Sequence, residues 1–253
     1  RDLQENDDKA VGEGMYHTTS DAIGRLEAED EKSLYWPRTA IKYGFTATAG
    51  TDEIASDQST QDELIKQDRL EGRAEAGTET YLTAKKWKAY NIEKGLDSEE
   101  NYKKVPLFMQ HKRALITVIL KAGEGVSRKS LYYSAAKKDI EAKIYSYKAG
   151  STVALPIKPY ARGVEIDYDE NTKDSTTCYE AIVSPHNYFE GRASELITTI
   201  SLSGQKYSFK GENDGNCSEE NYNLTEGKHL TLTITLGRNS RQTLISAYIE
   251  DYL

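Results

Sequence analysis

The fold of this chain is decided by residues 178–238, which read CYEAIVSPHNYFEGRASELITTISLSGQKYSFKGENDGNCSEENYNLTEGKHLTLTITLGR. Near the end of this stretch, large aliphatic residues alternate with threonines. The aliphatic set is Leu230, Leu232, Ile234 and Leu236, and the polar set is Thr231, Thr233 and Thr235. A period of two places the two sets on opposite faces of a β-strand. We therefore predict a strand over residues 229–236 that is interior to its sheet, with Leu232 and Ile234 buried.

A second alternation precedes the first. Residues 196–202 alternate more weakly, Ser203-Gly204 breaks the run, and residues 206–210 resume it with Tyr207 and Phe209 on a common face. Two alternating runs on either side of a break that contains glycine are typical of a β-hairpin. The stretch as a whole favours half-buried antiparallel sheet in the core of a β-sandwich, and it shows no catalytic constellation.

Further strands are expected on both sides of this stretch. Residues 114–120 read ALITVIL, with large aliphatic side chains on both faces, so this strand is expected to be central and buried on both sides. The other expected strands are 41–49, 140–147, 153–156, 164–168, 181–185 and 244–249. Residues 61–70 fit either a short helix or a strand, and no long helix is required. Strands at this spacing, separated by turn residues, indicate an all-β sandwich fold.

Composition narrows the class of protein. The 253 residues are enough for one large β domain or two ordinary ones. A net charge of −8 argues against nucleic acid as a partner, because phosphate binding needs clustered Lys and Arg. No apolar run approaches the ~20 residues of a membrane-spanning helix. The chain has 18 Tyr and 4 Phe, a balance that suits half-wet sheets and also suits surfaces that bind sugars or proteins.

The sequence contains few patterns that indicate a metal site or a disulfide. A disulfide between Cys178 and Cys217 and two free thiols both fit the sequence. The histidines show no zinc-ligand spacing, and residues 167–171 begin like a calcium loop but have Thr172 where the turn needs glycine. We expect no cofactor and no metal.

The amino-terminal part is less regular. Residues 1–33 are acidic and fit either a tail followed by an edge strand or a partly disordered arm. No signal peptide opens the sequence, so we expect any export signal to have been removed before residue 1. The segment 71–101 is charged and long, as functional or mobile excursions are. We expect a domain boundary near Tyr102–Pro106, which gives an amino-terminal β domain over 1–105 and a carboxy-terminal β-sandwich over 106–253.

The order of the sequence signals is distinctive. Tyr35-Trp36-Pro37 precedes a strand with Phe45 and Ala47, and further motifs follow down to Tyr252, where a Trp is more usual. Those motifs are Leu107, His111, Ala114, Ile116 and Val118; Ile182-Val183-Ser184-Pro185; Leu196, Ile197, Ile200, Gly204 and Tyr207; Leu224, Gly227, Lys228 and Ile234; and Ile249. This order, over residues 34–253, resembles the fimbrillin (Mfa-like) family, the surface pilins of Bacteroides-type bacteria.

The resemblance implies an architecture and a way of assembling. It implies two tandem β-sandwich domains of transthyretin-like topology, of which the first is incomplete in this numbering. It also implies export as a lipoprotein to the cell surface or outer membrane, although the usual lipid-attachment cysteine is missing here. Subunits of such fimbriae are trimmed by a protease, often arginine-specific, and are joined when one subunit donates a strand to a groove of the next.

We therefore expect a structural or adhesive fimbrial subunit (stalk, anchor or tip) and not an enzyme. Its partners would be other fimbrial subunits and a host or bacterial surface receptor. The alternative is a cell-surface lipoprotein that does not polymerise and binds carbohydrate or protein. Arg25 is the candidate processing site, because trimming there would uncover an edge strand near residues 34–49 for pairing with a neighbouring subunit.

Overall fold

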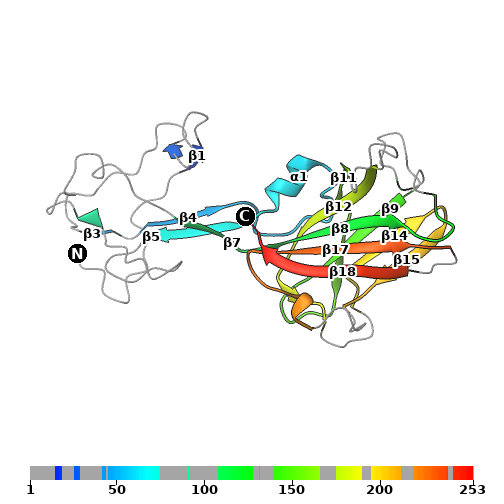
Figure 1. The fold of residues 1–253 in the computed structure, drawn as a ribbon. Coiled ribbons are helices and arrows are strands. Elements are labelled where there is room, and N and C mark those ends of the chain that lie inside the picture. Colours follow the sequence, from blue (N-terminus) through cyan, green and yellow to red (C-terminus); the bar gives the residue numbers. More distant parts are fainter. Residues whose placement is uncertain are drawn as a thin grey trace. The chain divides into compact units, whose positions relative to one another are not determined.

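The structure is a computed structural model, and it is built almost entirely of β-strands (Figure 1). It describes residues 15–18, 26–28, 42–43, 45–74, 90–91, 108–127, 131, 140–165, 175–189, 195–211, 219–238 and 242–252. The helices with bounds within the described residues are α1 (Gln61–Lys66) and a 3-10 turn, η2 (Glu219–Asn221). The strands are β1 Tyr16–Thr18, β2 Leu26–Ala28, β3 Lys42–Tyr43, β4 Phe45–Ala49, β5 Leu70–Ala74, β6 Tyr90–Asn91, β7 Phe108–His111, β8 Ala114–Ala122, β9 Ile140–Tyr147, β10 Ala154–Ile157, β11 Tyr160–Glu165, β12 Ser175–Val183, β13 His186–Asn187, β14 Thr198–Leu202, β15 Gln205–Phe209, β16 Asn223–Leu224, β17 Lys228–Leu236 and β18 Gln242–Asp251.

The chain divides into two compact units. One consists of Arg1–Ala47 and Gly72–Phe108, and the other of Thr48–Glu71 and Met109–Leu253. The first unit holds the two-stranded pairs β1-β2 and β3-β6, and the boundaries between the units fall inside the strands of the sheet β4-β5-β7. Residues 48–71 thus group with the second unit, whereas the sequence analysis assigned all of 1–105 to one domain. Independent folding of residues 106–253 stays a prediction, which expression of that fragment tests.

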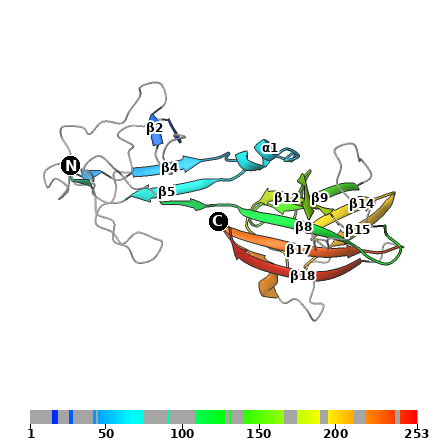
Figure 2. The ribbon, with the colours of Figure 1, turned by 45° about the horizontal axis from the view of Figure 1, so that its top comes forward.

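The second unit contains two larger sheets (Figure 2). One has four strands in the order β10-β9-β14-β15, and the other has five in the order β11-β12-β8-β17-β18. Hydrophobic side chains from both sheets form one buried cluster. Its members include Ile116, Val118, Leu230, Leu232 and Ile234 from the five-stranded sheet and Ile144, Ile200, Leu202 and Tyr207 from the four-stranded sheet. Two sheets around a shared apolar core form a β-sandwich, as the alternating patterns predicted.

Strand β17 and the hairpin behave as the sequence predicted. Leu232 and Ile234 are 1% and 0% exposed, and β17 lies between β8 and β18. Strands β14 and β15 pair antiparallel across Ser203-Gly204. Both turn residues have positive φ, 50° and 82°, the conformation that lets a two-residue turn match the twist of its strands. Strand β8 is central, as predicted.

The pairing at the centre of the five-stranded sheet corrects the sequence analysis. Strands β8 and β17 are parallel, whereas antiparallel sheet was expected for residues 178–238, which contain β17. Alternation fixes which side chains share a face but is the same for both strand directions. The two strands start side by side, since the backbone N–H of Gly227 donates to the carbonyl of Arg113 at 3.0 Å. The chain between them builds β9 to β16 before it returns.

Residues 61–66 form a helix, which resolves the earlier ambiguity. The side chain of Thr60 accepts a hydrogen bond from the backbone N–H of Glu63, so it caps the amino-terminal end. Asp62 and Glu63 lie in the first turn and Lys66 in the last, where they complement the helix dipole. One apolar side chain, Leu64, is buried. The short helix is therefore stabilised by its cap and by docking of its segment onto the second unit.

Candidate functional site: the outer face of the five-stranded sheet

The face of the five-stranded sheet that points away from the core carries a row of polar and aromatic residues. The register aligns Tyr160 with Glu180, Glu180 with Thr117, Thr117 with Thr231, and Thr231 with Tyr248. The row therefore crosses all five strands, with a tyrosine at each end. Thr117 and Thr231 are buried, at 5% and 3% exposed, whereas Tyr248 is 47% exposed.

His229 joins this row to the next one. Its Nε2 atom lies 2.8 Å from Thr117 Oγ1 and 3.3 Å from Thr231 Oγ1, and its Nδ1 atom lies 3.2 Å from Glu250 Oε1. Burial lowers the pKa of His229, and the Glu250 and Glu180 carboxylates oppose that shift. The imidazole thus has three polar contacts, with side chains on β8, β17 and β18, and the parallel pairing of β8 with β17 brings it next to Thr117.

Arg162 orders the opposite side of the face. Its Nη2 atom is 2.6 Å from Glu180 Oε1, and its Nε donates to Cys178 Sγ at 3.4 Å. Burial raises the pKa of the Cys178 thiol, although the neighbouring guanidinium opposes this. Cys178 is a free, buried cysteine in the structure. Cys217 lies outside the described residues, so the disulfide between the two stays a prediction.

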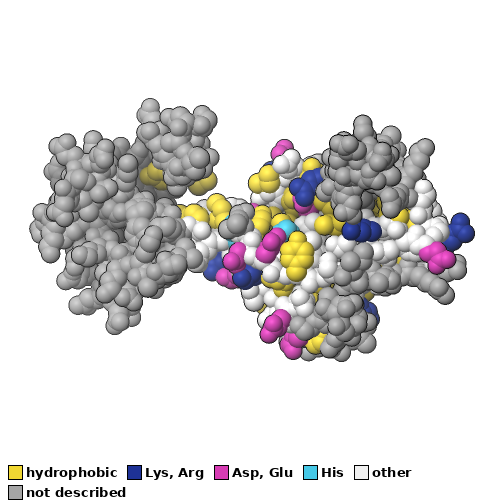
Figure 3. All heavy atoms as spheres, viewed as in Figure 1, with side chains coloured by type: hydrophobic (Ala, Val, Ile, Leu, Met, Phe, Trp, Pro, Cys, Tyr) yellow, Lys and Arg dark blue, Asp and Glu magenta, His cyan; other side chains and the backbone are white. Residues whose placement is uncertain are grey.

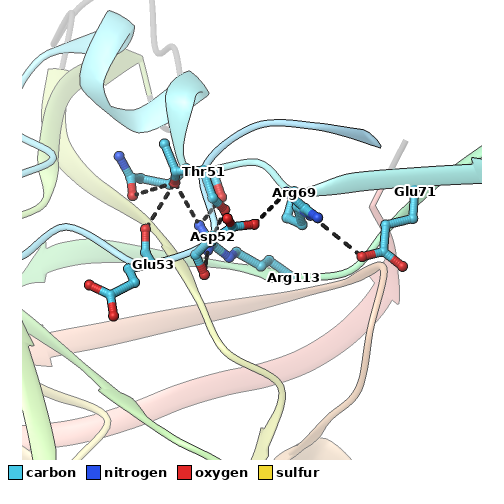
Figure 4. Close-up of polar contacts among 7 residues, drawn as sticks. Thr51, Asp52, Glu53, Arg69, Glu71 and Arg113 are labelled. Carbon is cyan, nitrogen blue, oxygen red and sulfur yellow. Dashed lines mark hydrogen bonds and ion pairs between the residues drawn. The ribbon is translucent and has the colours of Figure 1, made fainter. Parts of the chain in front are cut away.

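A polar cluster around Arg113 holds residues 48–71 on the second unit (Figure 4). Its guanidinium donates to the carbonyls of Gln67, Thr51 and Asp52 at 2.6, 2.7 and 2.9 Å. Arg69 Nη1 pairs with Asp52 Oδ1 at 2.7 Å. Burial lowers the pKa of Arg113, but a guanidinium stays charged in a protein. Arg113 is 6% exposed, so these carbonyls are what compensates its lost hydration.

Gln58 docks the same segment beside β12. It is fully buried, its Nε2 donates to the Ile182 carbonyl at 2.9 Å, and its Oε1 accepts from the Ile182 N–H at 2.9 Å. Asp57 forms a parallel bridge with Lys158, just before β11 begins. The Gln58 side-chain amide thus bonds the backbone of Ile182 on β12 just beyond the point where β12 pairs with β11. The sequence analysis missed this role, because a lone Gln in a polar loop carries no local signal of burial.

The sheet edges are the other surfaces relevant to assembly. Among the described residues, β4 and β18 each have one strand neighbour, β5 and β17. Thr46, Thr48 and Ala49 of β4 are exposed. On β18, the Asn221 side chain donates to the Ala247 carbonyl at 3.0 Å. Arg25, the predicted processing residue, lies outside the described residues, and β2 begins at Leu26.

The described residues give no sign of a metal centre. The histidines lie in β1, β7, β13 and β17, and no group of three His, Cys, Asp or Glu in this part of the chain could hold an ion. Neither helix that the structure describes is long or apolar enough to cross a membrane. The polar side chains and tyrosine rings of the outer face can therefore form hydrogen bonds and ring contacts. The polar side chains are already hydrogen-bonded to one another.

The chain is similar to known proteins in sequence and in structure. The sequence model of a family described as fimbrillin-like matches residues 2–251. A comparison with curated proteins found no match.

The fold is shared with a solved structure, and two further structures have lower TM-scores. A protein named for cell adhesion from Bacteroides uniformis has a TM-score of 0.61 at 17% identity, covering 97% of this chain and 87% of that chain. A second protein named for cell adhesion, from Bacteroides ovatus, has a TM-score of 0.43 at 15% identity, covering 83% and 60%. The tip fimbrial protein Mfa3 from Porphyromonas gingivalis has a TM-score of 0.35 at 11% identity, covering 81% and 70%.

Proposed function

Because the chain belongs to the fimbrillin-like family, we propose that it is a structural or adhesive subunit of a bacterial surface fimbria, joined to its neighbours by strand donation. The observation that carries the proposal is the family match over residues 2–251. The fold shared with the Bacteroides uniformis protein is consistent with it. Fimbrial location at the outer membrane and partnership with other fimbrial subunits and a surface receptor are parts of the same proposal.

Strand donation has a physical basis in the sheet edges. An edge strand leaves a row of backbone N–H and C=O groups without a ladder partner, and an added strand satisfies the row at once. Strand β4 lies at the end of its sheet order, and its side chains at 46, 48 and 49 are exposed. We propose that cleavage after Arg25 frees this edge for a strand of a neighbouring subunit.

The experiment is trimming of the purified chain with an arginine-specific protease, followed by light scattering and gel mobility. We expect the wild type to form polymers that resist dissociation, because a whole ladder must break at once. The matched control is Arg25→Gln, which should resist cleavage at that position and stay monomeric. Clean trimming at Arg25 with a product that stays monomeric at high concentration would contradict the proposal and favour the surface protein that does not polymerise.

Cells give the complementary readout. Negative-stain microscopy with an antibody against the chain should label filaments on the cell surface. Label confined to the envelope, with no filaments, would count against a stalk or tip subunit.

A further inference from the structure

The chain enters and leaves the five-stranded sheet at the same end. Strand β8 begins at Ala114 and β18 ends at Asp251, and Gly227 lies between these two positions, just before β17. The N–H of Gly227 donates to the Arg113 carbonyl at 3.0 Å, and its carbonyl accepts from the Tyr252 N–H at 2.7 Å. In Figure 2 the carboxy-terminal end accordingly lies beside the junction of β7 and β8. A force that pulls the two ends of the chain apart therefore reaches this sheet at one end of its strands.

This geometry decides how the sheet resists tension. Strands that are pulled past each other along their length share the load over all of their hydrogen bonds. Strands that are pulled apart from one end lose these bonds one after another and separate at a smaller force. The β8–β17 and β17–β18 pairs belong to the second kind, because the two pulled ends lie beside each other. Resistance to tension therefore depends on side-chain contacts at this end.

Two ion pairs bridge this end, but they lie at the surface. Lys112 Nζ is 2.8 Å from Glu226 Oε2, and Lys228 pairs with Asp251. The two carboxylate side chains are 55% and 74% exposed. On the face seen in Figure 3, positive and negative side chains of the described residues likewise lie next to one another at the surface. Water and salt screen such pairs, so they add little resistance.

His111 makes a more enclosed contact between the entering and leaving segments. It is the last residue of β7, and its ring centroid lies 4.3 Å from that of Tyr252, with 42° between the ring planes. Its Nδ1 atom lies 2.9 Å from Asp68 Oδ1, and the His111 and Asp68 side chains are 25% and 16% exposed. Burial raises the pKa of Tyr252 to about 12, and the Asp68 carboxylate adds to this shift. One imidazole thus connects residues 48–71, β7 and the end of β18.

The carboxylate that holds His111 is attached to the entering strand. The N–H of Lys112 donates to the Arg69 carbonyl at 2.7 Å, directly beside His111 and Asp68 in the sequence. Asp68 therefore moves together with His111 and keeps the imidazole in the orientation that meets Tyr252. Separation of the entering and leaving segments must then break the ring contact.

We propose that the contact of His111 with Tyr252, positioned by Asp68, is a mechanical clamp that closes the end of the five-stranded sheet where tension enters it. Subunits joined in series in a filament all carry the same tension, so the inference rests on the proposed fimbrial function. The clamp resists pulling at the end of the sheet where the strands would otherwise separate bond by bond.

The test pulls the purified full chain, without protease and as single molecules, at constant force between handles attached to residues 1 and 253. Rupture of the second unit is recognised by the length of chain that it releases, at about 3.5 Å a residue. We expect His111→Ala and Tyr252→Ala each to raise the rupture rate at a given force about fivefold, because the loss of a contact that is absent from the transition state mainly speeds unfolding. Tyr252→Phe keeps the ring and should rupture at the wild-type rate.

His186→Ala is the matched control. His186 makes the same two kinds of contact, since its ring stacks on Tyr147 at 4.6 Å and its Nε2 atom lies 3.2 Å from Glu195 Oε2. These partners belong to neither the entering nor the leaving segment. The His186 side chain is 13% exposed, so its removal should lower the free energy of unfolding in urea at least as much as His111→Ala does. The rupture rate of His186→Ala should nevertheless equal that of the wild type.

A wild-type rupture rate in both His111→Ala and Tyr252→Ala overturns the inference. An equal rise in His186→Ala overturns it as well, because the contact would then act through overall stability. Because one untrimmed chain is pulled at a time, this result is independent of whether trimming at Arg25 yields polymers.

Discussion

The two faces of the five-stranded sheet are built from the same strands but by different physics. The inner face presents aliphatic side chains such as Val118 and Leu232. Burial of their apolar area stabilises the fold, and this contribution does not depend on the direction of a contact. The outer face buries Thr117 and Thr231, whose hydroxyls need partners at defined positions and find them in His229. Apolar burial on the inner face therefore stabilises the sandwich, whereas hydrogen bonds on the outer face fix the positions of individual polar side chains.

The largest effect is expected on the inner face. Ile234→Ala removes a side chain that is 0% exposed and leaves a cavity between the two sheets. We expect a loss of about 2–5 kcal/mol in the free energy of unfolding. Urea denaturation of the variant and the wild type measures it. A loss below about 1 kcal/mol would show that the inner face is not close-packed at this position.

The next effect concerns the segment docked beside β12. Gln58→Ala leaves the N–H and carbonyl of Ile182 without their side-chain partners, which should cost about 1–3 kcal/mol in the free energy of unfolding. Gln61→Ala, at an exposed position on the same segment, is the matched control and should change the stability by less than about 0.5 kcal/mol. Equal effects in the two variants would mean that the segment does not depend on Gln58.

The third prediction concerns the pH dependence of the free energy of unfolding, to which His229 on the outer face contributes. Burial lowers the pKa of His229 in the folded state, so below pH ~6.5 the unfolded chain binds a proton that the folded chain resists. Stability from this group is therefore complete above that pH and is lost as the pH falls through the lowered folded-state pKa. Glu250, Glu180 and Arg162 are the charged groups that modulate the shift.

The measurement is the free energy of unfolding of the wild type and of His229→Gln between pH 7.5 and 5. The wild type should lose stability more steeply on acidification than the variant, which carries the other histidines unchanged. Parallel curves would show that His229 does not couple protonation to folding.

The smallest effect is expected at the neighbour of Ile234 in sequence. Thr233 lies on the outer face and is half-buried, so Thr233→Ser keeps the hydroxyl and removes one methyl group. We expect a change within about 1 kcal/mol in the same urea experiment. Losses of equal size at 233 and 234 would reverse the assignment of the two faces.

Local patterns predicted much of the fold because they report on faces and turns. The alternation of residues 229–236 located β17, and Ser203-Gly204 located the β14–β15 hairpin. The parallel pairing of β8 with β17 was not predictable, because strand direction across a long connection leaves no periodic trace. The docking of Gln58 on Ile182 was missed for a similar reason, since the two residues are 124 positions apart.

The candidate site was harder to predict from the sequence than the fold was. Thr231 was visible in the polar half of an alternation, whereas Thr117 was not singled out, and the tyrosine content fitted both half-wet sheets and binding surfaces. The row itself depends on register, which aligns Glu180, Thr117 and Thr231 from three strands. A shift of one residue in either pairing would move one of them to the opposite face. No single strand carries that information.

The parallel centre of the sheet also sets the order of events in time. Thr117 and His229 touch across the β8–β17 pair although they are 112 positions apart, so folding must close a long loop before the middle of the sheet exists. Until β17 joins, β8 has a strand partner on one edge only, β12. We expect the closing of this loop to be a slow step of folding, with the sandwich completed only when β17 has joined β8.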